Sequence, residues 1–219
     1  MTRGEITTRV QNRADRHDST TKGFIHKWIN ETIRVVEQTE PLQYTKKSQE
    51  ATISANNGVF TLPTTLILHH PFTFLVKLAG VTPDTYKYLV KVQDEVFVVD
   101  FPSPATSGDM PEYYQLTGGA DALSFKVTPV QNQETTLRLA NGYFYTGDFT
   151  ADEGGGEGDD EENWLTKYHP NLVIEGVCAM LFEHYGEPQK ADRARAMYQA
   201  FMYGDPVQGV QGLVPAQKK

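Results

Sequence analysis

The stretch FIHKWINETIRVV at residues 24–36 predicts an amphipathic helix, and the chain changes character after it. Its apolar residues recur at three- and four-residue steps, so they share one face of a helix that is expected to pack on a core. Pro41 ends the run a few residues later. A shorter helix is expected before it, over residues 5–13. It ends there because the polar residues 15–21 prefer turns and helix N-caps.

The middle of the chain follows the two-residue period of β-strands. Asn57-Gly58 predicts a type I′ hairpin, because both central residues of that turn need positive φ. This hairpin would pair Ile53 with Leu62 on one apolar face. Further strands are expected over residues 72–78, 95–101, 113–116, 123–128 and 135–145. The middle is therefore predicted to be an antiparallel β module.

One part of the middle is less regular. Thr82-Pro83 has the composition of a helix start, with Thr82 as the cap and Pro83 at the first helical position. Residues 86–90 fit either one helical turn or a strand.

The helical period returns near the C-terminus. Apolar residues share one face from Ile174 to Tyr185, Gly186 can end that helix, and Pro188 can start another. The predicted fold class is α+β: a helical bundle from the N- and C-terminal helices with an inserted antiparallel β module. The residues expected to pack in the bundle are Phe24, Trp28, Trp164, Leu181 and Phe201.

The expected domain organisation has five parts. They are the N-terminal helices of the bundle at 1–41, the β module at 42–150, an acidic Gly-rich loop at 151–162, the C-terminal helices at 163–204 and a flexible tail at 205–219.

The charge is concentrated in one segment. The 219 residues carry a net charge of -8, but seven acids and no base lie within residues 151–162. The rest of the chain is nearly neutral, which excludes a basic DNA-binding footprint as a global feature. Mutual repulsion and the glycines are expected to keep this segment extended and solvated. Weak cation binding is the alternative, because residues 155–160 match a single copy of a calcium-binding β-roll unit.

The sequence shows no template for catalysis or metal binding. It has no nucleophile elbow, zinc-protease motif, phosphate-binding loop or dinucleotide fingerprint, and its six histidines are scattered. The single cysteine, Cys178, cannot form an internal disulfide, which favours a reducing cytosol. We therefore expect no enzyme activity, no catalytic residue, no metal and no cofactor. The apolar runs are too short for a membrane span and the first residues do not resemble a secretory signal, so neither a membrane partner nor export is expected.

The order of short motifs resembles the head-to-tail adaptor (connector) proteins of tailed bacteriophages. The resemblance covers nearly the whole chain and rests on packing and turn patterns. The matching stretches are TRVQNR at 8–13, Phe24-Ile25, FTLP at 60–63, PEYY at 111–114, Gly118-Gly119, residues 123–129, Asn163-Trp164-Leu165, HPNL at 169–172, Gly176 and the helix over 188–203. The acidic insertion at 152–162 and the extension after Gly204 depart from the family pattern.

This resemblance implies a structural virion protein of the neck, assembled in the host cytoplasm. Copies would form a homo-oligomeric ring of twelve under the portal protein, extend the DNA channel and dock a tail or nozzle protein. Genomic DNA would pass without sequence-specific binding. A tail-side structural or binding module, such as a tail-completion or fibre-associated protein, is the alternative. A small cell-wall hydrolase acting through paired carboxylates is a less favoured alternative.

Two sets of residues are expected to mediate these contacts. The acidic loop would face the lumen or the rim of the ring through Asp152, Glu153, Glu157, Asp159, Asp160, Glu161 and Glu162. The C-terminal segment would meet the portal or a neighbouring copy through Val207, Gln208, Val210, Leu213, Val214, Lys218 and Lys219.

Overall fold

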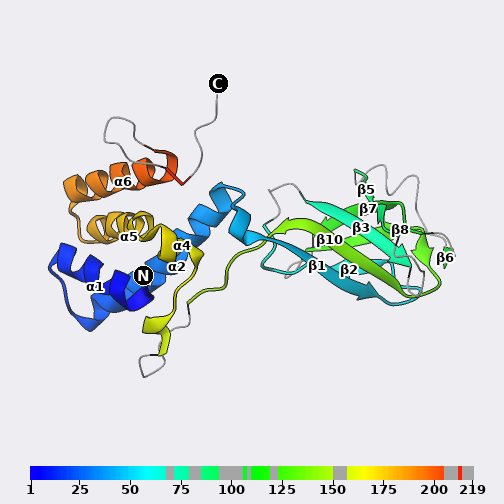
Figure 1. Cartoon of the computed structure of the whole chain (residues 1–219), viewed down its shortest axis with the longest axis horizontal. Helices are drawn as coiled ribbons and strands as arrows, with labels where there is room; N and C mark the ends of the chain where they lie inside the picture. The colour runs from blue at the N-terminus through cyan, green and yellow to red at the C-terminus, as the bar shows by residue number, and fades with distance from the viewer. Residues whose placement is uncertain are drawn as a thin grey trace. The chain divides into compact units, whose positions relative to one another are not determined.

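The computed structural model contains helices and β-sheets in two separate units (Figure 1). It describes residues 1–67, 72–78, 85–93, 106–107, 110–118, 123–149, 157–204 and 212–213. The helical unit comprises Met1–Glu40 and Thr146–Lys219, and the β unit comprises Pro41–Tyr145. The predicted α+β fold class, with helices from both ends of the chain and antiparallel sheets, is confirmed.

The helices of the helical unit begin and end at residues suited to those positions. Thr2 and Glu5 form a capping box at the start of the first helix, and Asp18 caps the second. Pro170 and Pro188 each occupy a first helical position, where the missing N–H costs no hydrogen bond. The helices are α1 (Arg3–Ala14), α2 (Ser19–Thr39), η2 (Glu157–Asp160), α4 (Trp164–Tyr168), α5 (Pro170–His184) and α6 (Pro188–Tyr203).

The α5 helix forms the centre of the helical unit. Every residue from 172 to 179 is buried, and α5 packs against α1, α2, α4 and α6. The predicted apolar stripe of α2 faces this core, with Ile25, Ile29 and Val36 fully buried. None of the helices in the described ranges combines the length and apolarity of a membrane span.

The β unit contains two four-stranded sheets, ordered β1-β10-β3-β4 and β2-β8-β7-β5 (Figure 1). One hydrophobic core joins them, with Phe74 and Leu137 contributed by the first sheet and Tyr114 and Val127 by the second. The elements are η1 (Gln43–Thr45), β1 (Lys46–Ile53), β2 (Val59–Thr61), β3 (Thr73–Leu78), β4 (Lys87–Tyr88), β5 (Val90–Lys91), β6 (Thr106–Ser107), β7 (Tyr113–Gly118), β8 (Leu123–Thr128), β9 (Val130–Gln131) and β10 (Thr135–Tyr143).

Most strand pairs of the β unit are antiparallel, as predicted. Two short pairs, β5 with β7 and β6 with β9, are parallel. Residues 86–90, which fit either a helical turn or a strand, contain β4 and the start of β5. The predicted strand at 95–101 and helix start at Thr82 lie outside the described residues.

The predicted hairpin around Asn57-Gly58 is wrong. β1 pairs with β10 and β2 pairs with β8, so the chain crosses from one sheet to the other at this turn. The residue with positive φ at this turn is Asn56, at 62°, and not Gly58. Gly58 is required for a different reason. A Cβ on Gly58 would lie 2.7 Å from the Val130 side chain, so glycine permits close packing there. Ile53 and Leu62 do share one core, but they approach it from different sheets.

Candidate functional site

The described part of the acidic segment is folded onto the helical unit. Glu157–Asp160 forms the short helix η2 beside α1, and the Arg3 N–H donates to the Glu161 carbonyl at 2.9 Å. The expectation of an extended, solvated loop is wrong for these residues, because basic side chains of α1 and α2 offset the repulsion among the acids. Asp152 and Glu153 lie outside the described residues.

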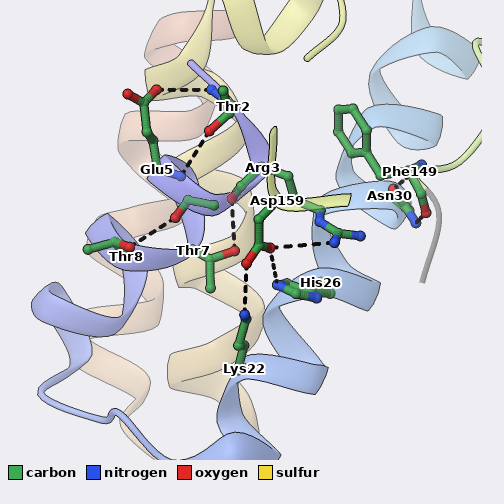
Figure 2. Close-up of polar contacts among 11 residues, drawn as sticks. Thr2, Arg3, Glu5, Thr7, Thr8, Lys22, His26, Asn30, Phe149 and Asp159 are labelled. Carbon is green, nitrogen blue, oxygen red and sulfur yellow. Dashed lines mark hydrogen bonds and ion pairs between the residues drawn. The ribbon is translucent and has the colours of Figure 1, made fainter. Parts of the chain in front are cut away.

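Asp159 is the centre of this attachment (Figure 2). Its carboxylate lies 3.4 Å from the Arg3 guanidinium, 2.9 Å from the Lys22 ammonium and 3.5 Å from the His26 ring nitrogen. Burial alone would raise the pKa of Asp159, but the hydrogen bond and charge of Lys22, with the charges of His26 and Arg3, outweigh it. The pKa of Asp159 is therefore lowered, and the group is a carboxylate at neutral pH.

Asp159 belongs to a longer connection, the return segment, which we define as residues 146–162. Its first part is held by polar side chains of α2, and Figure 2 includes the contact at Asn30. The contacts are Thr146 N–H to Glu37 (3.1 Å), the Arg34 guanidinium to Asp148 (3.0 and 2.5 Å), Phe149 N–H to Asn30 (3.1 Å) and Asn30 amide to the Phe149 carbonyl (3.3 Å). The contacts of its described residues move back along α2, from Glu37 for Thr146 to Lys22 for Asp159.

The α2 helix therefore has three faces. One face carries the apolar stripe against α5, and a second binds the return segment through side chains three or four residues apart. The third face carries Phe24, Trp28 and Val35. The rings of Phe24 and Trp28 stack with centroids 5.4 Å apart, and Val35 is 41% exposed.

The five residues expected to pack in the bundle occupy different environments. Leu181 is fully buried, whereas Phe24, Trp28 and Phe201 are half-buried. Trp164 is 38% exposed, because the α4 helix turns its neighbour Leu165 into the core instead.

The predicted portal-contacting residues lie mostly outside the described part of the chain. These are Val207, Gln208, Val210, Val214, Lys218 and Lys219. Leu213 is described, and its N–H donates to the Phe201 carbonyl at the end of α6 at 2.8 Å.

Several ionisable groups of the helical unit are paired or are shifted in pKa by burial. Arg13 and Glu175 form an ion pair at 2.5 Å, and burial raises the pKa of the neighbouring Cys178 to about 12. The Cys178 thiol is therefore protonated at neutral pH and a poor nucleophile. Burial also lowers the pKa of His169. Within the described ranges, no group of three or more His, Cys, Asp or Glu side chains could hold a metal ion.

Comparison of the sequence with protein-family models matches residues 1–211 to the SU10 adaptor protein family. The chain belongs to this family. It is a family of phage head–tail adaptors, so the protein is a structural adaptor of bacteriophage. Comparison with curated proteins found no match.

The attachment of the return segment to α2 was missed by sequence reasoning. A signal for it exists in the adaptor's sequence, because Lys22, His26, Asn30 and Arg34 recur every four residues beside the apolar stripe. This pattern shows that α2 has a polar face, but it does not indicate which distant segment binds there.

Proposed function

We propose that this adaptor assembles as a homo-oligomeric ring beneath the portal, extends the DNA channel and docks a tail or nozzle protein. Twelve copies would match the symmetry of the portal. The observation that carries the proposal is the family match over residues 1–211. The nearly neutral charge outside the acidic segment supports it, since a basic channel lining would bind DNA and slow its passage.

The direct test is sedimentation of the adaptor alone and mixed with the portal ring from the same genome. A stoichiometric complex with the portal is the expected result. If the adaptor never joins the portal, the head–tail role is wrong, and a tail-side structural module becomes the leading function.

We propose further that the acidic segment faces the lumen or the tail-side rim of the ring. Asp159 is paired with the cationic Arg3 and Lys22 side chains and lies beside the His26 ring, so it would contribute little repulsion toward DNA. Asp160 is exposed, and we propose that it supplies most of the repulsion together with Asp152 and Glu153, which lie outside the described residues.

The structure determines which variants can test this role. Deleting residues 152–162 would remove contacts that stabilise the helical unit, so point substitutions are required. We expect the triple variant Asp152→Asn, Glu153→Gln, Asp160→Asn to fold normally and to alter DNA retention or tail attachment in assembled particles. If both remain at wild-type levels, the proposed lumen or rim role is wrong.

The C-terminal segment is proposed to bind the portal or a neighbouring copy. Removal of residues 214–219 keeps the contact between Leu213 and Phe201 while deleting Val214, Lys218 and Lys219. Weaker portal binding is expected for this truncation. Unchanged portal binding would exclude these three residues from the interface.

A further inference from the structure

An apolar groove opens on the helical unit between α2, α5 and α6. Its volume is about 250 Å³, and its walls include Val35, Ala179, Met180 and Tyr198. Drug-sized ligands occupy pockets of roughly 300–1,000 Å³, so this groove suits one or two side chains better than a cofactor. Burial raises the pKa of Tyr198 to about 12, so its phenol remains a hydrogen-bond donor at neutral pH.

A pair of aromatic side chains projects from a different part of the same unit. Trp164 and Tyr168 lie one turn apart on α4, with ring centroids 5.5 Å apart, and are 38% and 60% exposed. Leu165 and Thr166 on the same helix are fully buried, and Asn163 caps it, so α4 holds the pair rigidly. Rigid, exposed tryptophan and tyrosine side chains are typical anchors of protein interfaces.

The aromatic pair cannot fill the groove of its own chain. α4 ends where α5 begins, whereas the groove lies along the second half of α5, between Gly176 and Glu183. With a rise of about 1.5 Å per residue, the aromatic pair and the middle of the groove are roughly 15 Å apart along the α5 axis.

The charges around the two surfaces are complementary. Glu183 and Arg195 line the groove, and Arg195 is shared between Glu183 and Asp192, which leaves one excess negative charge. Next to the aromatic pair, the Lys167 side chain is 53% exposed. Its ammonium and that of Met1 share the single Glu162 carboxylate, at 3.4 and 3.7 Å, which leaves one excess positive charge. The Lys167 ammonium can therefore approach the acidic edge of a groove on another molecule.

We propose that Trp164 and Tyr168 of one copy of the adaptor dock into the α2–α5–α6 groove of a second copy. The proposal rests on the ring assembly proposed above and identifies the surface through which copies meet. Because the two surfaces differ, the contact is head-to-tail, and such contacts generate rings when the rotation between copies closes.

This contact is too small to hold two copies together on its own. An aromatic side chain buries about 150–250 Å², whereas a stable interface needs about 800 Å² from each partner. Free copies should therefore associate weakly, and assembly should need high concentration or a template such as the portal.

Cross-linking of paired cysteine variants tests the proposal. The cysteines are placed at Asn171→Cys and Glu31→Cys, exposed positions within four residues of Tyr168 and Val35, so the aromatic pair and the groove stay intact. The two variants are made in separate chains, mixed at concentrations or with portal rings that give assembly, and treated with a short bismaleimide. Any cross-linked product must join two copies, because each chain carries one introduced cysteine and its Cys178 is buried out of reach of the reagent. We expect covalent dimers from this mixture. The matched control replaces Asn171→Cys with Tyr88→Cys, an exposed residue of the β unit, and should give none.

Sedimentation of Tyr168→Ser and Val35→Lys gives a second readout. Each should weaken assembly about tenfold to thirtyfold, as expected for an interface anchor, whereas Tyr88→Ser should behave as wild type. If the cysteine variants assemble but give no cross-linked dimer, and Tyr168→Ser and Val35→Lys assemble like the wild type, the docking proposal is wrong. The ring proposal is then unaffected. If the wild-type chain associates with neither itself nor the portal, the proposed function fails and the docking proposal fails with it.

Discussion

At the scale of single residues, Asp159 provides the clearest link between charge and stability. One carboxylate attaches η2 to α1 through Arg3 and to α2 through Lys22 and His26. We expect Asp159→Asn to reduce the free energy of unfolding by about 1–2 kcal/mol at pH 7, because charge-assisted hydrogen bonds are lost. Chemical denaturation followed by tryptophan fluorescence measures this change.

The difference in stability between the wild type and Asp159→Asn should depend on pH with a definite sign. The pKa of Asp159 is lower in the folded state than its ordinary value of 3.8, so its contribution is fully present above that value. The contribution is lost as the pH falls from about 4 through the folded pKa. Wild type and Asp159→Asn should therefore converge in stability at strongly acidic pH. A difference that stays constant down to pH 2 would show that the carboxylate charge is not its source.

Gly176 gives a second prediction at this scale. A Cβ there would lie 2.5 Å from the Thr32 methyl carbon and 3.2 Å from the Tyr198 ring. Gly176→Ala should therefore destabilise the protein by about 1–3 kcal/mol through overpacking, although alanine favours helix. Adding Thr32→Ser, which removes the methyl group, should recover part of the loss in thermal denaturation.

Gly23 on α2 is the matched control for Gly176, because no other group lies within 4 Å of a Cβ built there. Gly23→Ala should stabilise the protein by about 0.5–1 kcal/mol through helix propensity alone. Equal effects of the two substitutions would rule out the steric explanation.

At the scale of elements, the return segment depends most on Glu37. This buried carboxylate accepts hydrogen bonds from the N–H and hydroxyl groups of Thr146. Glu37→Ala should cost about 2–3 kcal/mol and accelerate hydrogen exchange at the Thr146 amide, because two partly buried donors lose a charged acceptor. Arg34→Ala breaks an exposed pair with Asp148 and should cost less than about 1 kcal/mol. A larger loss of stability from Arg34→Ala than from Glu37→Ala would contradict this expectation.

Elements whose signals are local were predictable from the sequence. The apolar spacing of α2 and α5, and the prolines and glycine around α6, depend only on neighbouring residues. The turn at Asn57-Gly58 also has a local signal, but that signal does not specify which strand pairs with which. The ladder partners of β1 and β2 lie more than sixty residues away, on β10 and β8, so the hairpin prediction failed.

Contacts between distant segments could not be predicted in this way. Asp159 lies 137 residues from Lys22 and 156 from Arg3, and no periodicity links them. The acids at 157–162 were recognised as a charged cluster, but their attachment to α1 and α2 depends on the fold.

At the scale of the whole molecule, the two units should unfold as separate cooperative transitions. Both tryptophans lie in the helical unit, whereas Phe74 is buried in the core of the β unit. Phe74→Ala should destabilise the β unit by about 3–5 kcal/mol. The far-UV circular dichroism transition should broaden or split, while the tryptophan fluorescence midpoint stays at its wild-type position. A matching shift of both signals would show that the units unfold together.

The hydrogen bond between Glu37 and Thr146 also bears on how the molecule could have evolved. It holds the returning chain within one helical turn of Glu40, where the chain leaves the helical unit. At the other side of the junction, the Phe144 N–H donates to the Thr45 carbonyl, so the ends of the β unit are also adjacent. A segment with adjacent ends can be gained, lost or exchanged between genomes without rebuilding the host fold. The helical unit can then be inherited intact while the inserted β unit varies.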